Sequence, residues 1–551
     1  MTDTLAIALA QIDPLVGDIA GNAAKIRAAR TQAAAMGAQL VIFSELVLSG
    51  YPPEDLVLKP AFQTKLAAAV AELAALTGDS GPAILLPTPW REAEGLYNAV
   101  LLLENGKIAA KRFKVDLPNY GVFDEKRVFA QGPMPGPIVF RGVRLGVPIC
   151  EDIWKGDVVE CLSETGAEIL IVPNGSPFEV DKRDVRLNIA VARIKESGLP
   201  LAYINQVGGQ DELVFDGGSF VLNADCRLAA QLPSFREAVT LTRWRRGATG
   251  WRCDQSEIAP SLSSNEAIYQ AMMLGLRDYV NKNRFPGIVL GLSGGIDSAI
   301  TAAVAVDALG AARVHCVMMP SPYTSRDSLD DAAECARLLG ARLDSISIEP
   351  AMKAFAAMLQ PQFDGRKPDT AEENVQARAR GITLMALSNK FGSMVVSTGN
   401  KSEMSVGYAT LYGDMCGGYS VLKDVYKTTV YAVSQWRNQH KPAGAMGPDG
   451  RVMPERILTK APTAELRPNQ TDQDSLPPYD VLDSILQGLI ERDLGVDELA
   501  AEGHDRATVE RVWRMLENAE YKRQQAPPGV KIGSRALSRD RRYPITNAFR
   551  G

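Results

Sequence analysis

Cys150, Glu45 and Lys114 are residue types that a thiol-based amide hydrolysis requires, and each lies at the end of an apolar run or beside a turn. Cys150 closes the run LGVPIC, and a thiol nucleophile needs a base or a cation to favour its thiolate. Glu45 ends VIFSE, where a carboxylate facing a pocket can act as general base. Lys114, in KRFKVDLPNYG, can favour the thiolate and stabilise the oxyanion formed when an amide carbonyl is attacked.

Each of these residues also has a purely structural interpretation. An isolated cysteine is most often a small core residue, Glu45 can be a strand-end carboxylate in water, and Lys114 can be a surface lysine. A cysteine–histidine pair is disfavoured because all three histidines follow residue 300: His315, His440 and His504. The base and the cation must therefore be other residue types.

The motifs around these residues resemble the nitrilase (carbon-nitrogen hydrolase) superfamily, whose hallmark is a Glu–Lys–Cys triad. They are SELVLSGYPPEDL, KVDLPNYGVFDEKRVF and VPICEDIW, and the resemblance covers about residues 4–240. It implies an α/β domain of the αββα sandwich type, with Glu45, Lys114 and Cys150 as the catalytic triad. For the glutaminase branch it also implies glutamine contacts by Tyr120, Ser176 and Lys182. Glu125 either supports Lys114 or forms a structural salt bridge.

A second constellation, LGLSGGIDSA, follows an apolar strand and opens a helix. Its glycines permit a tight turn that brings backbone N–H groups close to phosphate, and a helix N-terminus favours negative charge. Ser293 and Ser298 can add hydroxyl contacts, and Asp297 can hold Mg²⁺, which binds few carboxylates beside phosphate oxygens. No lysine follows the glycines as in GxxxxGK[ST], so γ-phosphoryl transfer is not the first expectation. A structural glycine turn is the alternative.

SGGIDS resembles the pyrophosphate loop of adenylating ATP pyrophosphatases. With ENVQARARG, STGNKSEMSVGYATLYGD, LKDVYKTTV, APTAEL and YKRQQAPPGVKI it resembles the NAD synthetases over about residues 265–550. This resemblance implies a doubly wound parallel sheet of the adenine-nucleotide α-hydrolase type that uses ATP and Mg²⁺. The implied ATP contacts are Leu290, Gly291, Leu292, Ser293, Gly294, Gly295, Ile296, Asp297, Ser298, Thr398, Lys427 and Thr463. The implied deamido-NAD contacts are Asn374, Glu403 and Lys522, and Glu403 joins Asp297 at the metal.

One position departs from this pattern. Stand-alone ammonia-dependent NAD synthetases typically carry a lysine where this chain has Leu411, so the contacts to the nicotinate carboxylate stay open, with Lys522 as the obvious substitute. Asn374 can instead cap a helix, and Lys522 can belong to a solvated basic face.

The elements that must position these residues form two successive α/β patterns. Up to about residue 245, apolar runs such as LAIALAQI, LVIFSE and ILIVPN alternate with helical segments such as KLAAAVAELAALTG. Residues 246–262 lose this periodicity and predict a linker between domains 1–245 and 263–551. The helix NEAIYQAMMLGLRDYVNKN and the alternation after it predict a parallel sheet with crossover helices.

Composition restricts the class of protein further. The 551 residues suit two domains, and a net charge of -5 does not favour a nucleic-acid binder. No run approaches 18 apolar residues, so we expect no membrane partner. The seven scattered cysteines contain no CxxC pair and fit a reducing cytoplasm. The family resemblance implies a homo-oligomer.

Together the resemblances imply that glutamine is hydrolysed to glutamate and ammonia, and that ATP adenylates deamido-NAD for amidation to NAD, giving AMP and pyrophosphate. Because ammonia largely protonates near neutral pH, an enclosed passage is expected. Two alternatives stay open: another amidotransferase, such as one making GMP, and a regulatory protein with a nitrilase fold that senses nucleotide. Incubation with ATP, glutamine and either deamido-NAD or XMP separates the three.

Overall fold

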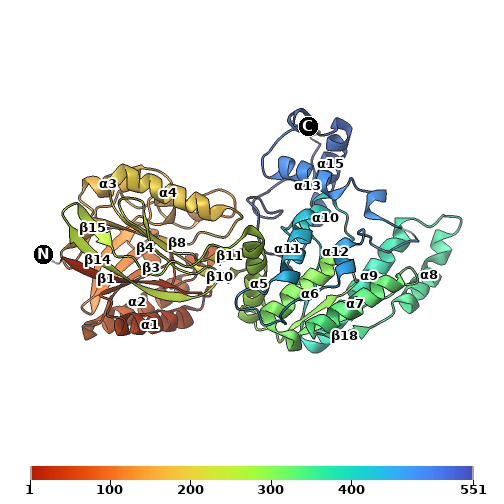
Figure 1. The fold of residues 1–551 in the computed structure, drawn as a ribbon, viewed down its shortest axis with the longest axis horizontal. Helices are drawn as coiled ribbons and strands as arrows, with labels where there is room; N and C mark the ends of the chain where they lie inside the picture. Colours follow the sequence, from red (N-terminus) through yellow and green to blue (C-terminus); the bar gives the residue numbers. More distant parts are fainter. Residues whose placement is uncertain (1–2, 469, 549–551) are drawn as a thin grey trace. The chain divides into compact units, whose positions relative to one another are not determined.

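The computed structural model describes residues 3–468 and 470–548, which form two compact units (Figure 1). The first unit ends at Ser261 and the second begins at Leu262, but the short turn Asp211–Leu213 groups with the second unit. No helix in the described part of the chain is both long enough and apolar enough to cross a membrane.

The first unit contains two large sheets and one short hairpin. The strands are β1 (Thr4–Gln11), β2 (Leu40–Phe43), β3 (Ala83–Arg91), β4 (Leu96–Glu104), β5 (Lys107–Phe113), β6 (Ile138–Phe140), β7 (Val143–Gly146), β8 (Ile169–Asn174), β9 (Leu201–Asn205), β10 (Val207–Gln210), β11 (Leu213–Asp216), β12 (Phe220–Leu222), β13 (Leu228–Gln231), β14 (Ala238–Gly247) and β15 (Gly250–Cys253). One sheet has the order β15-β14-β1-β2-β3-β4-β5, the other β13-β12-β9-β8-β7-β6, and β10 pairs with β11.

These sheets pack face to face, with helices on their outer faces. The outer helices are α1 (Ile19–Ala35), α2 (Pro60–Leu76), α3 (Asp157–Glu164) and α4 (Lys182–Ser197). Successive strand residues point to opposite faces, so Ile171 of β8 joins Ile7 of β1 in the core between the sheets. Its neighbour Leu170 packs against Leu162 of α3 and Ile194 of α4. The predicted αββα sandwich is confirmed.

Residues 246–262 differ from the predicted linker. They include the end of β14 and all of β15, which pair as an antiparallel hairpin at the edge of the first sheet. The GATG turn that joins the two strands requires Gly250, whose φ is +108°. A turn of small residues therefore joins β14 to β15, and this part of the chain extends the sheet.

The second unit contains a parallel sheet of five strands: β16 (Ile288–Gly291), β17 (Val314–Met318), β18 (Arg342–Ser345), β19 (Met394–Ser397) and β20 (Tyr419–Ser420). Its order is β18-β17-β16-β19-β20. The chain runs outward from β16 to β18 and then returns to the other side of β16. Since ligands bind at the carboxyl ends of strands where the order reverses, β16 marks the expected site, and the doubly wound fold is confirmed.

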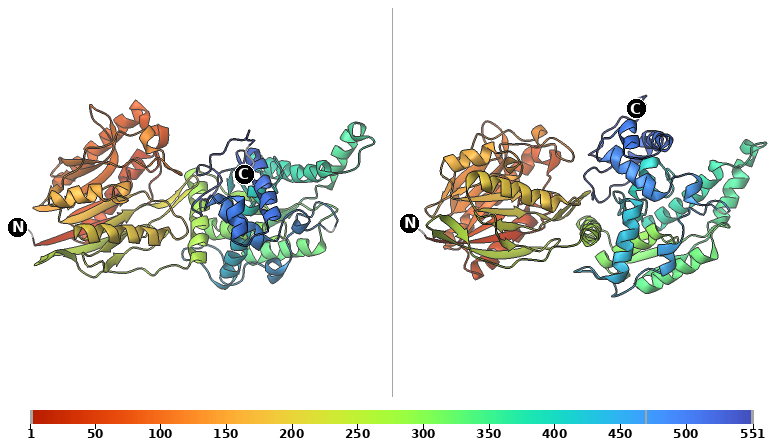
Figure 2. Two further views of the ribbon diagram at one scale, coloured as in Figure 1. Left: turned by 90° about the horizontal axis from the view of Figure 1, so that it is seen from above. Right: turned by 45° about the horizontal axis from the view of Figure 1, so that its top comes forward.

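Twelve helices are described around this sheet: α5 (Ser264–Lys282), α6 (Ile296–Leu309), α7 (Arg326–Leu339), α8 (Glu349–Phe363), α9 (Thr370–Phe391), α10 (Lys401–Val406), α11 (Lys427–Gln439), α12 (Glu455–Thr459), α13 (Tyr479–Ile490), α14 (Val496–Ala501), α15 (Arg506–Asn518) and α16 (Glu520–Arg523). Helices α8 and α9 lie side by side and extend past the sheet (Figure 2). Helices α10, α13 and α15 share a separate apolar core.

Candidate active sites

Glu45, Lys114 and Cys150 converge inside the first unit. Glu45 follows β2, Lys114 follows β5, and Cys150 begins the 3-10 helix η4 (Cys150–Ile153) after β7. All three side chains are buried, and the Nζ of Lys114 donates to Oε1 of Glu45 at 2.7 Å. The charges of Glu45 and Lys114 both act on the pKa of Cys150, so the three residues form one cluster.

A second carboxylate, Glu125, completes the surroundings of Lys114. The Lys114 Nζ donates to its Oε1 at 2.9 Å, and the Tyr51 hydroxyl donates to the same oxygen at 2.9 Å. The Asn98 amide donates to Glu45 at 2.7 Å and to Glu125 at 3.4 Å. Glu125 thus contacts Lys114, as both interpretations of Glu125 require, whereas Asn98 and Tyr51 were not predicted. Tyr51 lies within the SELVLSGYPPEDL motif, but Asn98 lies in an apolar run that gives no signal.

The protonation states of the cluster follow from burial and charge. Burial opposes the ammonium form of Lys114, but Glu125 and Glu45 outweigh it and raise its pKa well above the usual value. Burial raises the pKa of Glu125 to about 7, with Lys114 opposing and Glu45 adding to the rise. Burial and Glu45 also raise the pKa of Cys150, and Lys114 offsets this only in part. Lys114 therefore acts on the pKa of Cys150 in the expected direction, but the net shift is upward, which favours the thiol form and calls for a base during attack.

Of the predicted glutamine contacts, Tyr120 lies beside the nucleophile. Its hydroxyl donates to both oxygens of Glu151, at 3.1 and 2.9 Å, and the charge of Cys150 acts on its pKa. Glu151 directly follows Cys150, and burial raises its pKa. Sequence reasoning missed Glu151, although its position in CEDIW was a signal.

Ser176 lies close to the same cluster, and Lys182 lies over a residue that follows the nucleophile in the chain. Ser176 follows Gly175, whose N–H donates to Glu45 Oε2 at 2.9 Å. The Ser176 hydroxyl accepts a hydrogen bond from Arg186 at 3.0 Å. Lys182 begins α4, donates to Glu179 at 3.1 Å and lies over the ring of Trp154, 5.2 Å from its centroid. Trp154 ends the η4 segment that starts with Cys150.

In the second unit a cavity of about 290 Å³ lies at the carboxyl ends of β16, β17 and β19. Its lining includes most of the predicted ATP positions: Gly291, Leu292, Ser293, Gly295, Ile296, Asp297, Ser298, Thr398, Lys427 and Thr463. Leu290 is instead buried inside β16. Gly294 has a φ of +80°, and a Cβ there would meet the carbonyl oxygen of Ser328 at 2.2 Å, so only glycine fits.

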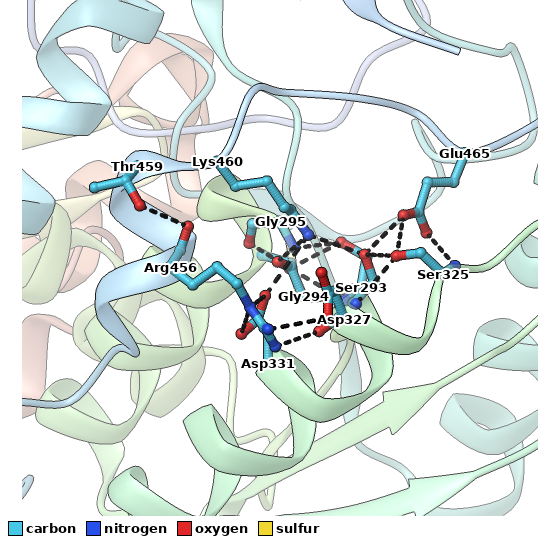
Figure 3. A network of polar contacts seen from close by, with 12 residues as sticks. Ser293, Gly294, Gly295, Ser325, Asp327, Asp331, Arg456, Thr459, Lys460 and Glu465 are labelled. Atoms are coloured by element: carbon cyan, nitrogen blue, oxygen red, sulfur yellow. Dashed lines mark hydrogen bonds and ion pairs between the residues drawn. The ribbon is translucent and has the colours of Figure 1, made fainter. Parts of the chain in front are cut away.

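The glycine-rich loop is held in shape by its own serines. The Ser293 N–H donates to Ser298 Oγ at 3.2 Å. The Gly295 N–H donates to Ser293 Oγ at 3.2 Å, and Figure 3 shows these two residues. Helix α6 starts immediately after Gly295, so its N-terminus faces the cavity end of the loop. This arrangement favours an anion such as phosphate.

Asp297 and Glu403 converge on the amine of Lys427, which is in contact with Asp297 and lies 3.1 Å from Glu403. The Asn400 amide fixes the other oxygen of Asp297 at 3.0 Å. Burial raises the pKa of Glu403 to about 7, with Lys427 opposing. No cluster of three or more metal-ligating side chains is found in the described part of the chain. Two carboxylates that already share one cation nevertheless fit Mg²⁺, which takes its remaining ligands from phosphate and water.

Asn374 and Lys522 do not line this cavity. Both form hydrogen bonds with the segment 407–410, which contributes to the lining. Thr410 Oγ1 donates to Asn374 Oδ1 at 2.9 Å. Lys522 donates to the carbonyls of Gly407 at 2.8 Å and Ala409 at 2.6 Å. Tyr408 and Thr410 of this segment line the cavity, while Leu411 packs against the apolar core of α13 and α15.

The fold and these two sites define a class: an ATP-dependent ligase that carries its own glutaminase. Residues 6–250 match the carbon-nitrogen hydrolase family, and residues 268–526 match the NAD synthase family. The two matched segments coincide with the sandwich and with the parallel sheet, respectively.

Full-length relatives then fix the family. The chain is 52% identical to the glutamine-dependent NAD(+) synthetase of Rhodobacter capsulatus over 100% of both chains, and 44% identical to that of Acinetobacter baylyi over 99% of this chain and 98% of the relative. The structure of the Acinetobacter baumannii synthetase in complex with ADP matches at 44% identity with a TM-score of 0.79, covering 99% of both chains. The chain belongs to the glutamine-dependent NAD(+) synthetases, which combine glutaminase and NAD synthase activities. The predicted function is confirmed.

Proposed function

We propose that Glu45, Lys114 and Cys150 carry out the glutaminase reaction. The contact of Lys114 with Glu45, in a buried cluster that also contains Cys150, is the observation that supports it. As the sulfur attacks the side-chain amide carbon, the thiol proton passes to Glu45 and the Lys114 ammonium stabilises the oxyanion. Glu45 then gives the proton to the departing ammonia. Water hydrolyses the glutamyl thioester with Glu45 as base.

Recognition of glutamine needs groups of both charges, because the free amino acid carries an ammonium and a carboxylate. The Glu151 carboxylate, next to Cys150 and held by Tyr120, is suited to the α-ammonium group. Lys182 offers a cation close to Trp154 for the α-carboxylate, and Ser176 adds a hydroxyl. We therefore retain Tyr120, Ser176 and Lys182 as glutamine contacts and add Glu151.

We propose that the cavity of the second unit binds ATP with its phosphates at the glycine-rich loop. Support comes from the loop residues that line the cavity, from the N-terminus of α6 and from the relative that holds ADP. Asp297 and Glu403 would hold Mg²⁺, which would neutralise phosphate charge. Asn374 and Lys522 act on deamido-NAD by placing the 407–410 segment, and Glu403 adds a contact. The nicotinate carboxylate attacks the α-phosphorus, pyrophosphate leaves, and ammonia displaces AMP.

We further propose that the chain works as a homo-oligomer in the cytoplasm. All seven cysteines are free thiols, as a reducing compartment requires. Met358 of α8 and Ile382 and Phe391 of α9 are 58–67% exposed, which leaves apolar area that a second copy would cover.

One experiment tests both reactions. Cys150→Ala is supplied with ATP, ammonium chloride and deamido-NAD labelled with oxygen-18 in the nicotinate carboxylate. We expect NAD to form from ammonium, no product to form when glutamine replaces ammonium, and one labelled oxygen to appear in AMP. ADP and inorganic phosphate as stoichiometric products would contradict adenylation. Loss of ammonium-supported synthesis in the folded variant would contradict the division of labour.

A further inference from the structure

Lys460 brings a positive charge to the glycine-rich loop, although the loop contains no lysine. It directly follows α12, lines the cavity and points at the loop (Figure 3). Its Nζ donates to Ser328 Oγ at 2.9 Å and to the carbonyl oxygen of Gly294 at 3.4 Å. The ammonium therefore lies where the first turn of α7 meets the loop in front of α6.

The charge of Lys460 is only loosely paired. Its ion pair with Asp331 spans 3.7 Å from Nζ to Oδ2, beyond hydrogen-bond distance. Arg456 already holds both oxygens of Asp331, at 2.9 and 3.1 Å. Lys427, the other lysine in the lining, is committed to Asp297 and Glu403. Of these two lysines, Lys460 is the one whose hydrogen bonds go to neutral oxygens.

We propose that Lys460 binds the β- and γ-phosphates of ATP and stabilises pyrophosphate as it leaves. The proposal rests on adenylation by the second unit. A carboxylate oxygen of deamido-NAD forms a bond to the α-phosphorus, and the bond from the α-phosphorus to the oxygen that bridges it to the β-phosphorus breaks. The electron pair stays on that oxygen, so the pyrophosphate gains negative charge. An ammonium at this place stabilises that charge without transferring a proton.

The present contacts of Lys460 are ones that a phosphate can replace. Ser328 Oγ accepts from Lys460 and donates onward to Glu465 Oε1 at 2.8 Å, and Ser325 donates to the same oxygen at 2.7 Å. A charged phosphate oxygen is a stronger acceptor for an ammonium than a hydroxyl or a carbonyl oxygen is. Because Lys460 already lines the cavity, a phosphate bound there can compete with Ser328 for the amine.

The test is the exchange of labelled pyrophosphate into ATP, dependent on deamido-NAD and run without glutamine or ammonium, so that only adenylation is measured. Lys460→Gln should lower the exchange turnover on the order of 100-fold, the loss typical of removing one group that stabilises developing charge. It should raise the KM for pyrophosphate and leave the KM for deamido-NAD within about twofold. Lys460→Arg should recover much of the loss, and Lys353→Gln, at an exposed lysine of α8, serves as control.

The outcomes distinguish a failure of the proposed role of Lys460 from a failure of adenylation, on which that role rests. If the wild-type protein shows no exchange dependent on deamido-NAD, adenylation itself is wrong. If the wild-type protein shows exchange and the exchange turnover of folded Lys460→Gln is within threefold of the wild-type value, Lys460 is only a structural link. Should Lys460→Gln not fold, acetylation of wild-type lysines followed by peptide mass analysis replaces it. Inorganic pyrophosphate with Mg²⁺ should protect Lys460 at least fivefold and leave Lys353 unprotected; equal labelling of Lys460 with and without pyrophosphate overturns the proposal.

Discussion

Lys114→Met removes the positive charge that separates two buried carboxyl groups. Lys114 lies 2.7 Å from Glu45 and 2.9 Å from Glu125, and methionine retains most of the side-chain length without the charge. Breaking a buried ion pair by removing one partner typically costs about 3–5 kcal/mol. We expect the free energy of unfolding of the first unit to fall by about this amount at pH 8 and by less at pH 6.

The pH dependence arises from Glu125. Burial raises its pKa, Lys114 lowers it and Glu45 raises it, and the balance with Lys114 present is about 7. Without Lys114 the pKa rises further, so the folded variant keeps a proton that the unfolded chain releases near pH 4.5. A carboxyl pKa that is raised in the folded state makes stability fall as pH rises from the unfolded pKa to the folded one. Between these two pKa values the free energy of unfolding falls by roughly 1 kcal/mol per pH unit.

A compensated variant separates this charge imbalance from catalysis. In Lys114→Met/Glu125→Gln one carboxyl group becomes a neutral amide, so stability should recover toward the wild-type value. Its glutaminase turnover should stay about 100- to 1,000-fold low, the range for loss of an oxyanion donor. Synthesis from ammonium should persist in both variants.

The assay is glutamate release, beside NAD formation from ammonium and hydrogen-exchange protection of β2 and β5 in urea at pH 6 and pH 8. Protection in these strands reports the first unit alone. Lys111→Met and Lys126→Met control for general loss of positive charge. Near-normal glutaminase turnover in the double variant, or an equal fall in the controls, would refute Lys114 as the oxyanion cation. A stability difference independent of pH would refute the argument about the two carboxyl groups.

Two further predictions concern the nucleophile and the metal. Because burial and Glu45 raise the pKa of Cys150, its alkylation by iodoacetamide should be slow at pH 7 and accelerate as pH rises; equal rates at pH 6 and pH 9 would show a resting thiolate. Glu403→Gln removes one of the two carboxylates around Lys427, so the Mg²⁺ concentration for half-maximal synthesis from ammonium should rise about 10-fold or more. An unchanged requirement for Mg²⁺ would remove Glu403 from the proposed metal site.

The strands that sequence patterns predicted well are those buried on both faces. LVIFSE and ILIVPN correspond to β2 and β8, whose residues are all buried, so their apolar runs are continuous. The hairpin of β14 and β15 was missed because its two strands alternate buried and exposed residues instead of forming continuous apolar runs. Trp244 is buried while its neighbours Arg243 and Arg245 are exposed, and the GATG turn has the composition of a linker.

The sequence pointed to those residues of the candidate sites that lie within one motif. Asn98 and Lys460 were not predicted from the sequence, because each forms hydrogen bonds with residues far away in the chain. Asn98 joins Glu45 to Glu125 from inside an apolar strand, and Lys460 reaches Gly294 across 166 positions. Local periodicity reports which face a side chain occupies, but it does not report which distant loop that face meets.

The clusters around Lys114 and Lys427 are similar in charge, but the proposed function gives them different chemistry. Each is a buried ammonium between two carboxyl groups, one of which has a pKa raised to about 7. In the proposed glutaminase reaction the glutamine amide is neutral, so Lys114 would stay in place for the negative charge that appears only during attack. In the proposed adenylation ATP would bring its own charge and Mg²⁺, to which Lys427 would yield its two carboxylates. Loss of Lys114 should therefore reduce turnover, whereas loss of Lys427 should first change the requirement for the metal.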